Sequence, residues 1–315
     1  MIINYLILAH NSPNHVKRLI NRLNGHDVYF YIHIDAKSNL DEFLSVIKHE
    51  NNVHFLIGNE RKSIKWAGFE IIEATLQLMK KATAINKNGF CVLLSGQDYP
   101  IKSKSQISEV LSANPDKIFI EGFSLPSKKN WGPSGGMNRL NQYHFILGKR
   151  GESKAISYIF SGEFWRKSKL WDVYDLMRVG KLKEFGKFFQ KRKFPNYLKP
   201  YGGSQWWSMP SEVVLQIQSF LDQHPDYIAY HKYTLCPDEI FFHSITFSLF
   251  PEKVTNQSTT YVNWIREGVT LPVLFDNLND LTELLDAEQL FARKFDEVRS
   301  QELLNQIDEK VHKIK

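Results

Sequence analysis

Residues 2–34 read IINYLILAHNSPNHVKRLINRLNGHDVYFYIHI and contain a strand–helix–strand pattern. Residues 2–8 are a short apolar run, and residues 28–34 are rich in aromatic and β-branched side chains, so both predict buried strands. Between them, residues 12–23 begin with Ser-Pro, which is typical of the first turn of a helix. Two strands joined by a helix of this length predict a parallel βαβ unit.

The same alternation continues outward from this unit. Helical apolar spacing recurs in several later segments, namely 40–49, 68–85, 211–223, 238–247 and 300–315. Short apolar runs predict the remaining strands, namely 53–57, 90–94, 117–121 and 204–208. We therefore expect an α/β fold with a Rossmann-like, mixed but mostly parallel sheet that is flanked by helices.

The composition bounds the class of protein. A chain of 315 residues with 43% apolar and 23% charged residues is typical of globular proteins, and disorder, collagen and coiled coil are excluded for the whole chain. No apolar run approaches the roughly 20 residues of a membrane span. Cys91 and Cys236 form no zinc or disulfide pattern, which favours a reducing cytoplasm. The net charge of +6 favours an anionic partner.

Several common catalytic signatures are missing from the sequence. No GxGxxG follows a predicted strand, and no GxxxxGK[ST] occurs, so neither a dinucleotide fold nor a P-loop NTPase has its fingerprint. The HExxH motif of zinc proteases and the GxSxG elbow of serine hydrolases are also missing.

Polar residues follow three of the predicted strands. His10 comes after the first strand, His33 and Asp35 end the second, and Gln97 and Asp98 follow the run over 90–94. Ligands of open parallel sheets bind beyond the carboxyl ends of the strands, so these residues predict one polar crevice. The alternative is that Asp35 and Asp98 only cap turns.

A second group of candidate residues is Cys236-Pro237-Asp238-Glu239. Proline followed by acids is a favourable helix start, so capping alone explains the pair of carboxylates. However, an apolar, aromatic run follows Glu239, and a carboxylate against such a wall is suited to act as a general base. Both interpretations remain open from the residues alone.

Seven blocks of the chain, taken in order, resemble the core-2/I-branching β-1,6-N-acetylglucosaminyltransferase family, which is glycosyltransferase family 14 and includes the peptide O-xylosyltransferases. The blocks are LILAHNSPNHVKRLI (6–20), YIHIDAKS (31–38), KWAGFEIIEATLQLM (65–79), LLSGQDYPIKSKSQI (93–107), GGSQWWSMPSEVV (202–214), CPDEIFFHSI (236–245) and LFARKFD (290–296). The resemblance spans nearly the whole chain except 122–200.

This resemblance implies an A-type glycosyltransferase fold in a single domain over 1–315. Within it we expect a nucleotide-sugar-binding half (1–121), a variable helical region for the acceptor (122–203), and a catalytic and diphosphate-binding half (204–315). The implied reaction is inverting, metal-independent transfer from a UDP-sugar, most often GlcNAc in a β-1,6 branch, to a glycan or glycolipid. Transfer of xylose or another sugar is the alternative, as is an inactive sugar-binding protein.

The resemblance also assigns roles to individual residues. Glu239 corresponds to the catalytic base, and Lys294 to the lysine that neutralises the diphosphate. No Asp-x-Asp metal motif occurs in the chain, so no cofactor is expected. Mammalian members use an additional arginine where residues 268–272 here have none. Either Arg266 or Arg293 replaces it, or the diphosphate is held more weakly.

The remaining site residues are expectations of the same kind. The donor side is expected to include His10, His33, Asp35, Trp66, Gln97 and Asp98. The acceptor side is expected to include Glu121, Arg139, Trp207, Trp264 and Arg266. For His10 and Trp264, ordinary packing is the alternative. Trp206 and Trp207 point to opposite faces of a predicted strand, so one is expected in the core and the other at the site.

Residues 181–199 combine a phenylalanine stripe with seven basic side chains against one acid, Glu184. The pattern fits an interfacial helix on an anionic membrane, or a helix that packs its phenylalanines inward and solvates its basic face. Nucleic-acid binding is not expected, because no recognition motif accompanies the charge. Together these features favour a bacterial cytoplasmic enzyme of polysaccharide or lipooligosaccharide synthesis, with peripheral contact at the inner face of the inner membrane as an option.

Overall fold

A central six-stranded sheet forms the core of the computed structural model, which describes residues 1–47, 51–147 and 152–313. The strand order is β3 (Val53–Phe55), β2 (Val28–Ile34), β1 (Ile3–Ala9), β4 (Phe90–Ser95), β9 (Tyr201–Pro210) and β6 (Phe119–Ser124). Strands β3, β2, β1 and β4 pair in parallel, whereas β9 is antiparallel to both of its neighbours. The predicted Rossmann-like, mostly parallel α/β fold is therefore confirmed.

The alternation of side chains along β1 explains why helices cover both faces of this sheet. Leu6 and Leu8 pack into one hydrophobic cluster, and Tyr5 and Ile7 pack into another on the opposite face. The first cluster is closed by α3 (Glu70–Ile85), α8 (Ser211–Gln223), α9 (Pro225–His231) and α10 (Phe241–Leu249). The second is closed by α1 (Pro13–Leu23), α2 (Leu40–Val46) and α4 (Lys104–Ala113). Each buried leucine contributes ~1.5–3 kcal/mol to folding.

A second, three-stranded sheet joins the C-terminal part of the chain to the N-terminal half. Its order is β10 (Thr260–Val262), β11 (Phe291–Arg293) and β5 (Asp98–Pro100), and β11 runs antiparallel to β5. Helices α11 (Asp280–Asp286) and α12 (Gln301–Ile307) pack over it around Tyr99 and Phe275. Residues on β5 and β11 that are distant in sequence thus become direct neighbours.

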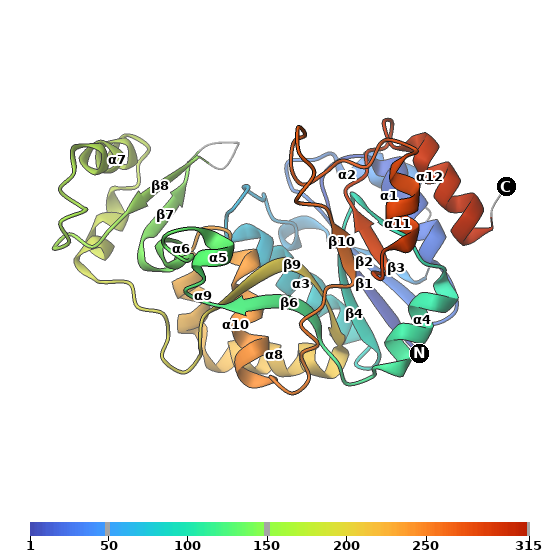
Figure 1. The fold of residues 1–315 in the computed structure, drawn as a ribbon. Helices are drawn as coiled ribbons and strands as arrows, with labels where there is room; N and C mark the ends of the chain where they lie inside the picture. The colour runs from blue at the N-terminus through green and yellow to red at the C-terminus, as the bar shows by residue number, and fades with distance from the viewer. Residues whose placement is uncertain (48–50, 148–151, 314–315) are drawn as a thin grey trace.

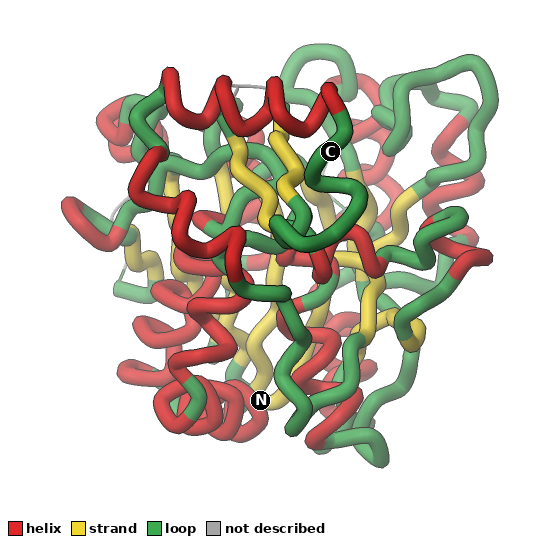
Figure 2. The backbone as a smooth tube through the Cα atoms, turned by 90° about the vertical axis from the view of Figure 1, so that its left-hand side faces the viewer, coloured by secondary structure: helices red, strands yellow, loops and turns green. Residues whose placement is uncertain are grey.

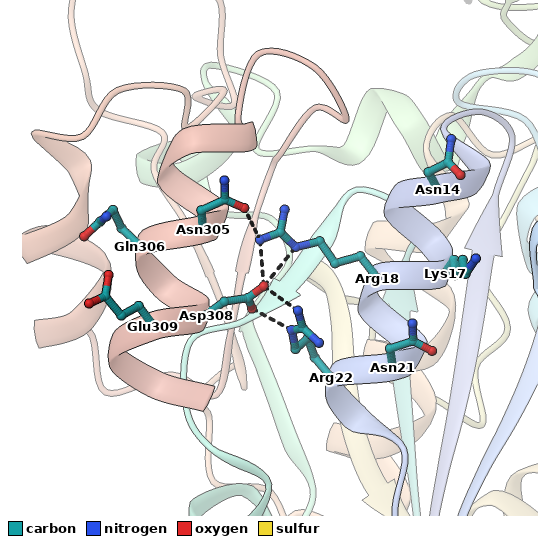
Figure 3. Close-up of a pocket in the computed structure, with 9 residues that line it drawn as sticks. All are labelled: Asn14, Lys17, Arg18, Asn21, Arg22, Asn305, Gln306, Asp308 and Glu309. Carbon is teal, nitrogen blue, oxygen red and sulfur yellow. Dashed lines mark hydrogen bonds and ion pairs between the residues drawn. The ribbon is translucent and has the colours of Figure 1, made fainter. Parts of the chain in front are cut away.

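The C-terminal helices are fastened to α1 by one carboxylate. Asp308 lies in a π-helical turn (Asp308–His312) and accepts hydrogen bonds from Arg18, Arg22 and the Tyr99 hydroxyl. Arg18, Arg22 and Asp308 are among the residues that line a cavity of about 730 Å³ between α1 and the C-terminal helices (Figure 3). Burial acts to raise the pKa of Asp308, but these hydrogen bonds outweigh it and hold the pKa below its usual range.

The segment between β6 and β9 differs from its prediction. We predicted a helical region, but besides α5 (Lys128–Trp131), α6 (Met137–Asn141), α7 (Lys167–Arg178) and a 3-10 helix (Leu182–Phe189) it contains a hairpin of β7 (Tyr143–Ile146) and β8 (Ser153–Ile156). We call residues 143–147 and 152–193 the lobe. Figure 1 shows the lobe projecting at the opposite end from α12, and Figure 2 views the molecule from the side of the lobe.

The lobe has a small aromatic core, and a buried arginine ties its end to the rest of the molecule. Phe145, Val173 and Phe188 are among the side chains of its core. At the end of the lobe, the guanidinium of Arg192 is buried and donates to the backbone oxygens of Gln142, Tyr230 and Tyr233. The guanidinium also lies over the Tyr230 ring, at 4.2 Å. This contact brings the last part of the lobe back to the point where β7 begins.

Among the described residues, no helix has the length and apolar character that crossing a membrane requires.

Candidate active site

The turn that carries Glu239 is a short 3-10 helix (Pro237–Glu239) in front of α10. The turn is held to the segment that precedes α3, because the Cys236 amide donates to the Ala67 carbonyl at 3.1 Å. The Glu239 carboxylate is partly exposed and forms an ion pair with the guanidinium of Arg139 from α6. Arg139 is itself stacked over the Trp131 ring, at 3.9 Å. The structure thus brings the expected base into contact with an expected acceptor-side residue.

Asp238 makes a second carboxylate in the same turn. Its Oδ1 is shielded from solvent and has no hydrogen-bond partner among the described residues. Burial and the neighbouring Glu239 raise the pKa of Asp238 to about 7, and the charges of Arg139 and Arg293 oppose that shift. A hydrogen bond with its own backbone amide also opposes the rise of this pKa. The sequence offered no signal beyond its position beside Glu239.

Asp98 is fully buried and holds Arg293. Its Oδ1 accepts from the Arg293 Nε at 3.1 Å and from the Ser95 hydroxyl at 2.6 Å, and its Oδ2 accepts from the Ser95 amide at 2.8 Å. Burial raises the pKa of Asp98, and Arg293 and Ser95 partly offset that shift. The guanidinium of Arg293 lies over the Trp206 ring, at 4.3 Å. In this arrangement Asp98 positions an arginine rather than presenting itself to a ligand.

Lys294 follows Arg293 and is half-buried. Its backbone is fixed by hydrogen bonds to Val273 and Phe275, and the next amide, of Phe295, donates to the Gln97 carbonyl at 2.9 Å. Burial and the adjacent Arg293 lower the pKa of Lys294. Gln97, Arg293 and Lys294 therefore lie close together.

The two arginines considered for the missing phosphate ligand have different surroundings. The Nη2 of Arg266 is within 2.8 Å of Asp280 and 2.9 Å of Glu283. Its charge is thus neutralised by two carboxylates within the C-terminal segment. Arg293, by contrast, lies next to Lys294 and acts electrostatically on Asp238. Of the two arginines, Arg293 is the one that adjoins Lys294, and its own partner is the single carboxylate of Asp98.

At the end of β2, the side chains of His33 and Asp35 bind backbone amides of neighbouring loops. His33 is fully buried, and its Nε2 accepts from the Lys62 amide at 2.8 Å. Burial lowers the pKa of His33 to about 4, so the ring is neutral at physiological pH. Asp35 accepts from the Lys37 amide at 2.8 Å, which is the turn-capping arrangement. Arg61, which the sequence analysis missed, donates to three backbone oxygens of this loop, those of residues 34, 35 and 38.

Three expected site residues are open to solvent near these groups. The Trp66 side chain is 66% exposed and precedes Ala67, which bonds the Glu239 turn. Trp264 is 56% exposed and follows Asn263, whose carbonyl accepts from the Val273 amide next to Lys294. His10 is exposed at the end of β1. An exposed indole face suits the apolar side of a sugar ring.

Glu121 and Trp207 are placed differently. Glu121 is exposed on β6, at the irregularity between Ile120 and Gly122. Trp207 has no exposed surface and packs on Phe242 in the core, so our expectation that it contacts an acceptor is wrong for this structure. Its neighbour Trp206 is the one that reaches the site, through its ring contact with Arg293.

The chemistry available here is that of a cluster of charged side chains with exposed indole rings on neighbouring segments. Glu239 is paired with Arg139, and Asp98 is paired with Arg293. The charges of both arginines act to lower the pKa of Asp238. Such a site has a carboxylate to accept a proton and cations to stabilise a leaving anion. Among the described residues, no group of three or more His, Cys, Asp or Glu side chains is placed to hold a metal ion.

The chain is similar to known proteins over most of its length. The family model "Core-2/I-Branching enzyme" matches residues 3–273. Similar curated proteins include a xylosyltransferase of Ciona intestinalis (23% identical, covering 98% of this chain and 34% of that protein) and xylosyltransferase 2 of Rattus norvegicus (24% identical, covering 96% and 33%). The chain thus spans about a third of the length of these relatives. Among solved structures, mouse xyloside xylosyltransferase 1 is similar with a TM-score of 0.39, at 11% identity over 92% of this chain and 97% of that one.

Proposed function

The chain belongs to the Core-2/I-branching enzyme family, and from this premise we propose that it is an inverting glycosyltransferase. It takes a sugar from a UDP-sugar and attaches it to a hydroxyl group of a glycan or glycolipid. The observation that carries the proposal is the ion pair between Glu239 and Arg139, beside a second carboxylate that senses the charge of Arg293. One carboxylate is thus oriented by an arginine, and its neighbour Asp238 lies within the electrostatic reach of a second arginine.

Glu239 is the proposed general base. The acceptor hydroxyl attacks the anomeric carbon from the face opposite UDP, and its proton passes to the Glu239 carboxylate. The bond between the anomeric carbon and the diphosphate breaks, and UDP leaves with the electron pair. General-base catalysis of this kind contributes roughly 10²–10⁴ in rate. Arg139 orients the carboxylate through its contact with Oε2.

Lys294 and Arg293 are the proposed stabilisers of the leaving diphosphate. Charge-assisted hydrogen bonds from fixed cations stabilise a developing phosphate charge in the way that a bound cation would. Arg293 is held in place by Asp98 and Trp206, so its position needs no adjustment during the reaction. On this basis we propose that the reaction proceeds without a metal.

Two donors are candidates. The β-1,6-N-acetylglucosaminyl transfer that the resemblance implied favours UDP-GlcNAc. The curated relatives described above are named xylosyltransferases, which favours UDP-xylose as the second candidate. Trp66 and Trp264 are the aromatic faces against which we place the sugar rings, since both are exposed.

UDP release from a panel of UDP-sugars tests the proposal, with each reaction run in EDTA, in Mg²⁺ and in Mn²⁺. Release from one sugar, at the same rate in EDTA, identifies the donor and supports the metal-free reaction. Loss of release in EDTA would overturn the roles of Lys294 and Arg293. Absence of release from every sugar, with and without simple sugar acceptors, together with no UDP binding, would overturn the glycosyltransferase itself.

A further inference from the structure

Helix α7 of the lobe carries large apolar side chains on two faces. Val173 and Leu176 point into the core of the lobe. A second set lies at positions i, i+1, i+4 and i+7 and is exposed, namely Leu170, Trp171, Tyr174 and Met177. A surface helix of a globular protein normally has one apolar stripe, with polar residues on the opposite face. The exposed stripe of α7 therefore has no partner among the described residues.

Neighbouring parts of the lobe add to this exposed apolar surface. Phe160 is 72% exposed and Trp165 is 62% exposed, both in the segment between β8 and α7. Phe189, at the end of the 3-10 helix, lies with its ring centroid 6.4 Å from that of Phe160 and is also exposed. We call the exposed side chains of Phe160, Trp165, Leu170, Trp171, Tyr174, Met177 and Phe189 the aromatic surface. Exposed apolar groups in this number mark an interaction site.

The charge of the same segment is concentrated. Residues 152–199 contain twelve basic and five acidic side chains, a net charge of +7, whereas the whole chain carries +6. The rest of the chain is therefore nearly neutral. On α7 itself, Asp172 and Asp175 are bound by Lys154, and Asp172 also by Lys169. The cations that remain exposed around the aromatic surface are Arg166, Lys167, Arg178, Lys181 and Lys183.

We propose that the lobe docks on an anionic lipid bilayer, with α7 lying in the plane of the interface. Tryptophan and tyrosine side chains favour the headgroup region of a bilayer, because one end of each is apolar and the other polar. Lysine and arginine around them are attracted to anionic headgroups. A second copy of the chain fits this surface poorly, because two lobes that each carry a net charge of +6 would repel each other.

The docking would orient the candidate active site. The lobe is continuous with α6, which carries Arg139, and Lys65 from the loop beside the Glu239 turn contacts the Ile146 carbonyl at the tip of β7. A bilayer under the lobe therefore lies near the side from which we expect the acceptor. This consequence rests on the proposed function, and it favours an acceptor that is anchored in the same bilayer. The docking of the lobe does not depend on the proposed function.

Co-sedimentation of the full chain with lipid vesicles tests the docking. Vesicles of phosphatidylcholine alone are compared with vesicles that also contain phosphatidylglycerol. We expect the protein to pellet with the anionic vesicles, less so at high salt, with a blue shift of tryptophan fluorescence. The double variant Trp171→Ser/Tyr174→Ser should bind at least about tenfold more weakly, because it loses the inserted aromatic groups. The variant Lys181→Glu/Lys183→Glu should lose the dependence on anionic lipid.

Matched controls separate docking from folding and from catalysis. Leu278→Ser and Lys87→Glu change exposed residues outside the lobe and should bind vesicles like the unaltered protein. The melting temperature of the Trp171→Ser/Tyr174→Ser variant and its UDP release with a water-soluble acceptor should stay unchanged. Failure of the unaltered chain to bind anionic vesicles would overturn the proposal. So would a dimer in solution that this double variant dissociates, since a second copy would then cover the aromatic surface.

Discussion

Arg293 donates its Nε to the fully buried Oδ1 of Asp98 across 3.1 Å, although the two residues are 195 positions apart in the sequence. They become neighbours because β11 pairs with β5 in the three-stranded sheet. The cation that we place beside the leaving diphosphate is therefore held by the N-terminal half of the molecule. If Arg293 has the role that we propose, the binding of a donor and the integrity of the fold depend on the same contact.

Replacing Asp98 should reveal that dependence. Asp98→Asn removes the carboxylate charge that is paired with the guanidinium of Arg293. Removing one member of a buried ion pair costs ~3–5 kcal/mol. We expect a lower free energy of unfolding in urea, whereas Asp222→Asn, at an exposed carboxylate on α8, should change it little. The double variant Asp98→Asn/Arg293→Met should regain part of the loss. If Asp98→Asn unfolds at the same urea concentration as the unaltered protein, the contact does not hold the fold.

Replacing the base should separate chemistry from binding. Glu239→Gln keeps the size of the side chain but cannot accept the proton of the acceptor hydroxyl. We expect kcat to fall by roughly 10²–10⁴ while the affinity for UDP, measured by calorimetry, stays within a few-fold. Glu212→Gln, at an exposed position on α8, is the control and should keep full activity. A Glu239→Gln enzyme of normal kcat would assign the base elsewhere.

Replacing Lys294 should act on the leaving group. Lys294→Met removes the charge and keeps most of the side-chain volume, so we expect kcat to fall about 10²-fold or more, as for the loss of one fixed stabiliser of a transition state. UDP affinity should weaken as well, in contrast to Glu239→Gln. Lys87→Met is the matched control at an exposed site. Unchanged UDP affinity in Lys294→Met would remove this residue from the diphosphate site.

Asp238 should make stability depend on pH. Its pKa is raised to about 7 in the folded state, whereas an unfolded chain has an aspartate pKa of about 3.9. As pH rises from about 4 to about 7, the unfolded state loses the proton first, so this group progressively destabilises the native state. The melting temperature of Asp238→Asn relative to the unaltered protein should therefore increase across that window and level off above it. Thermal melts in a series of buffers measure this difference, and a constant difference would contradict the raised pKa.

The parts of the fold that the sequence predicted are those with a strong apolar pattern. Strand β2 was predicted with its observed bounds from its run of aromatic and β-branched residues, and the structure buries six of its seven residues, on both faces of the sheet. The hairpin of β7 and β8 was missed, since its strands are short and lie in a segment without clear alternation. Residues 181–199 were expected to form a helix, but regular structure there is limited to a 3-10 helix (Leu182–Phe189), which contains Gly186.

The sequence predicted which residues belong to the candidate site better than it predicted the interactions that each of them makes. The proximity of Arg139 and Glu239 required the fold, because 100 residues separate them. Asp35 and Asp98 are equivalent as polar residues after strands, yet one caps a turn and the other neutralises a buried arginine. Neighbours on a strand alternate between faces, so the sequence predicted that one of Trp206 and Trp207 faces the site but selected the wrong one. Only the direction of β9 against α10 decides between them.

Arg192 gives the lobe a particular evolutionary freedom. Because its guanidinium ties the last residues of the lobe to the carbonyl of Gln142, where the lobe begins, the chain leaves and rejoins the body at nearly the same place. Insertions, deletions or wholesale exchange between those points need not shift the central sheet or the turn of Glu239. The lobe can therefore vary as a unit, independently of the rest of the fold. A lineage can thus change the surface that the lobe presents, including its exposed aromatic side chains, without rebuilding the rest of the fold.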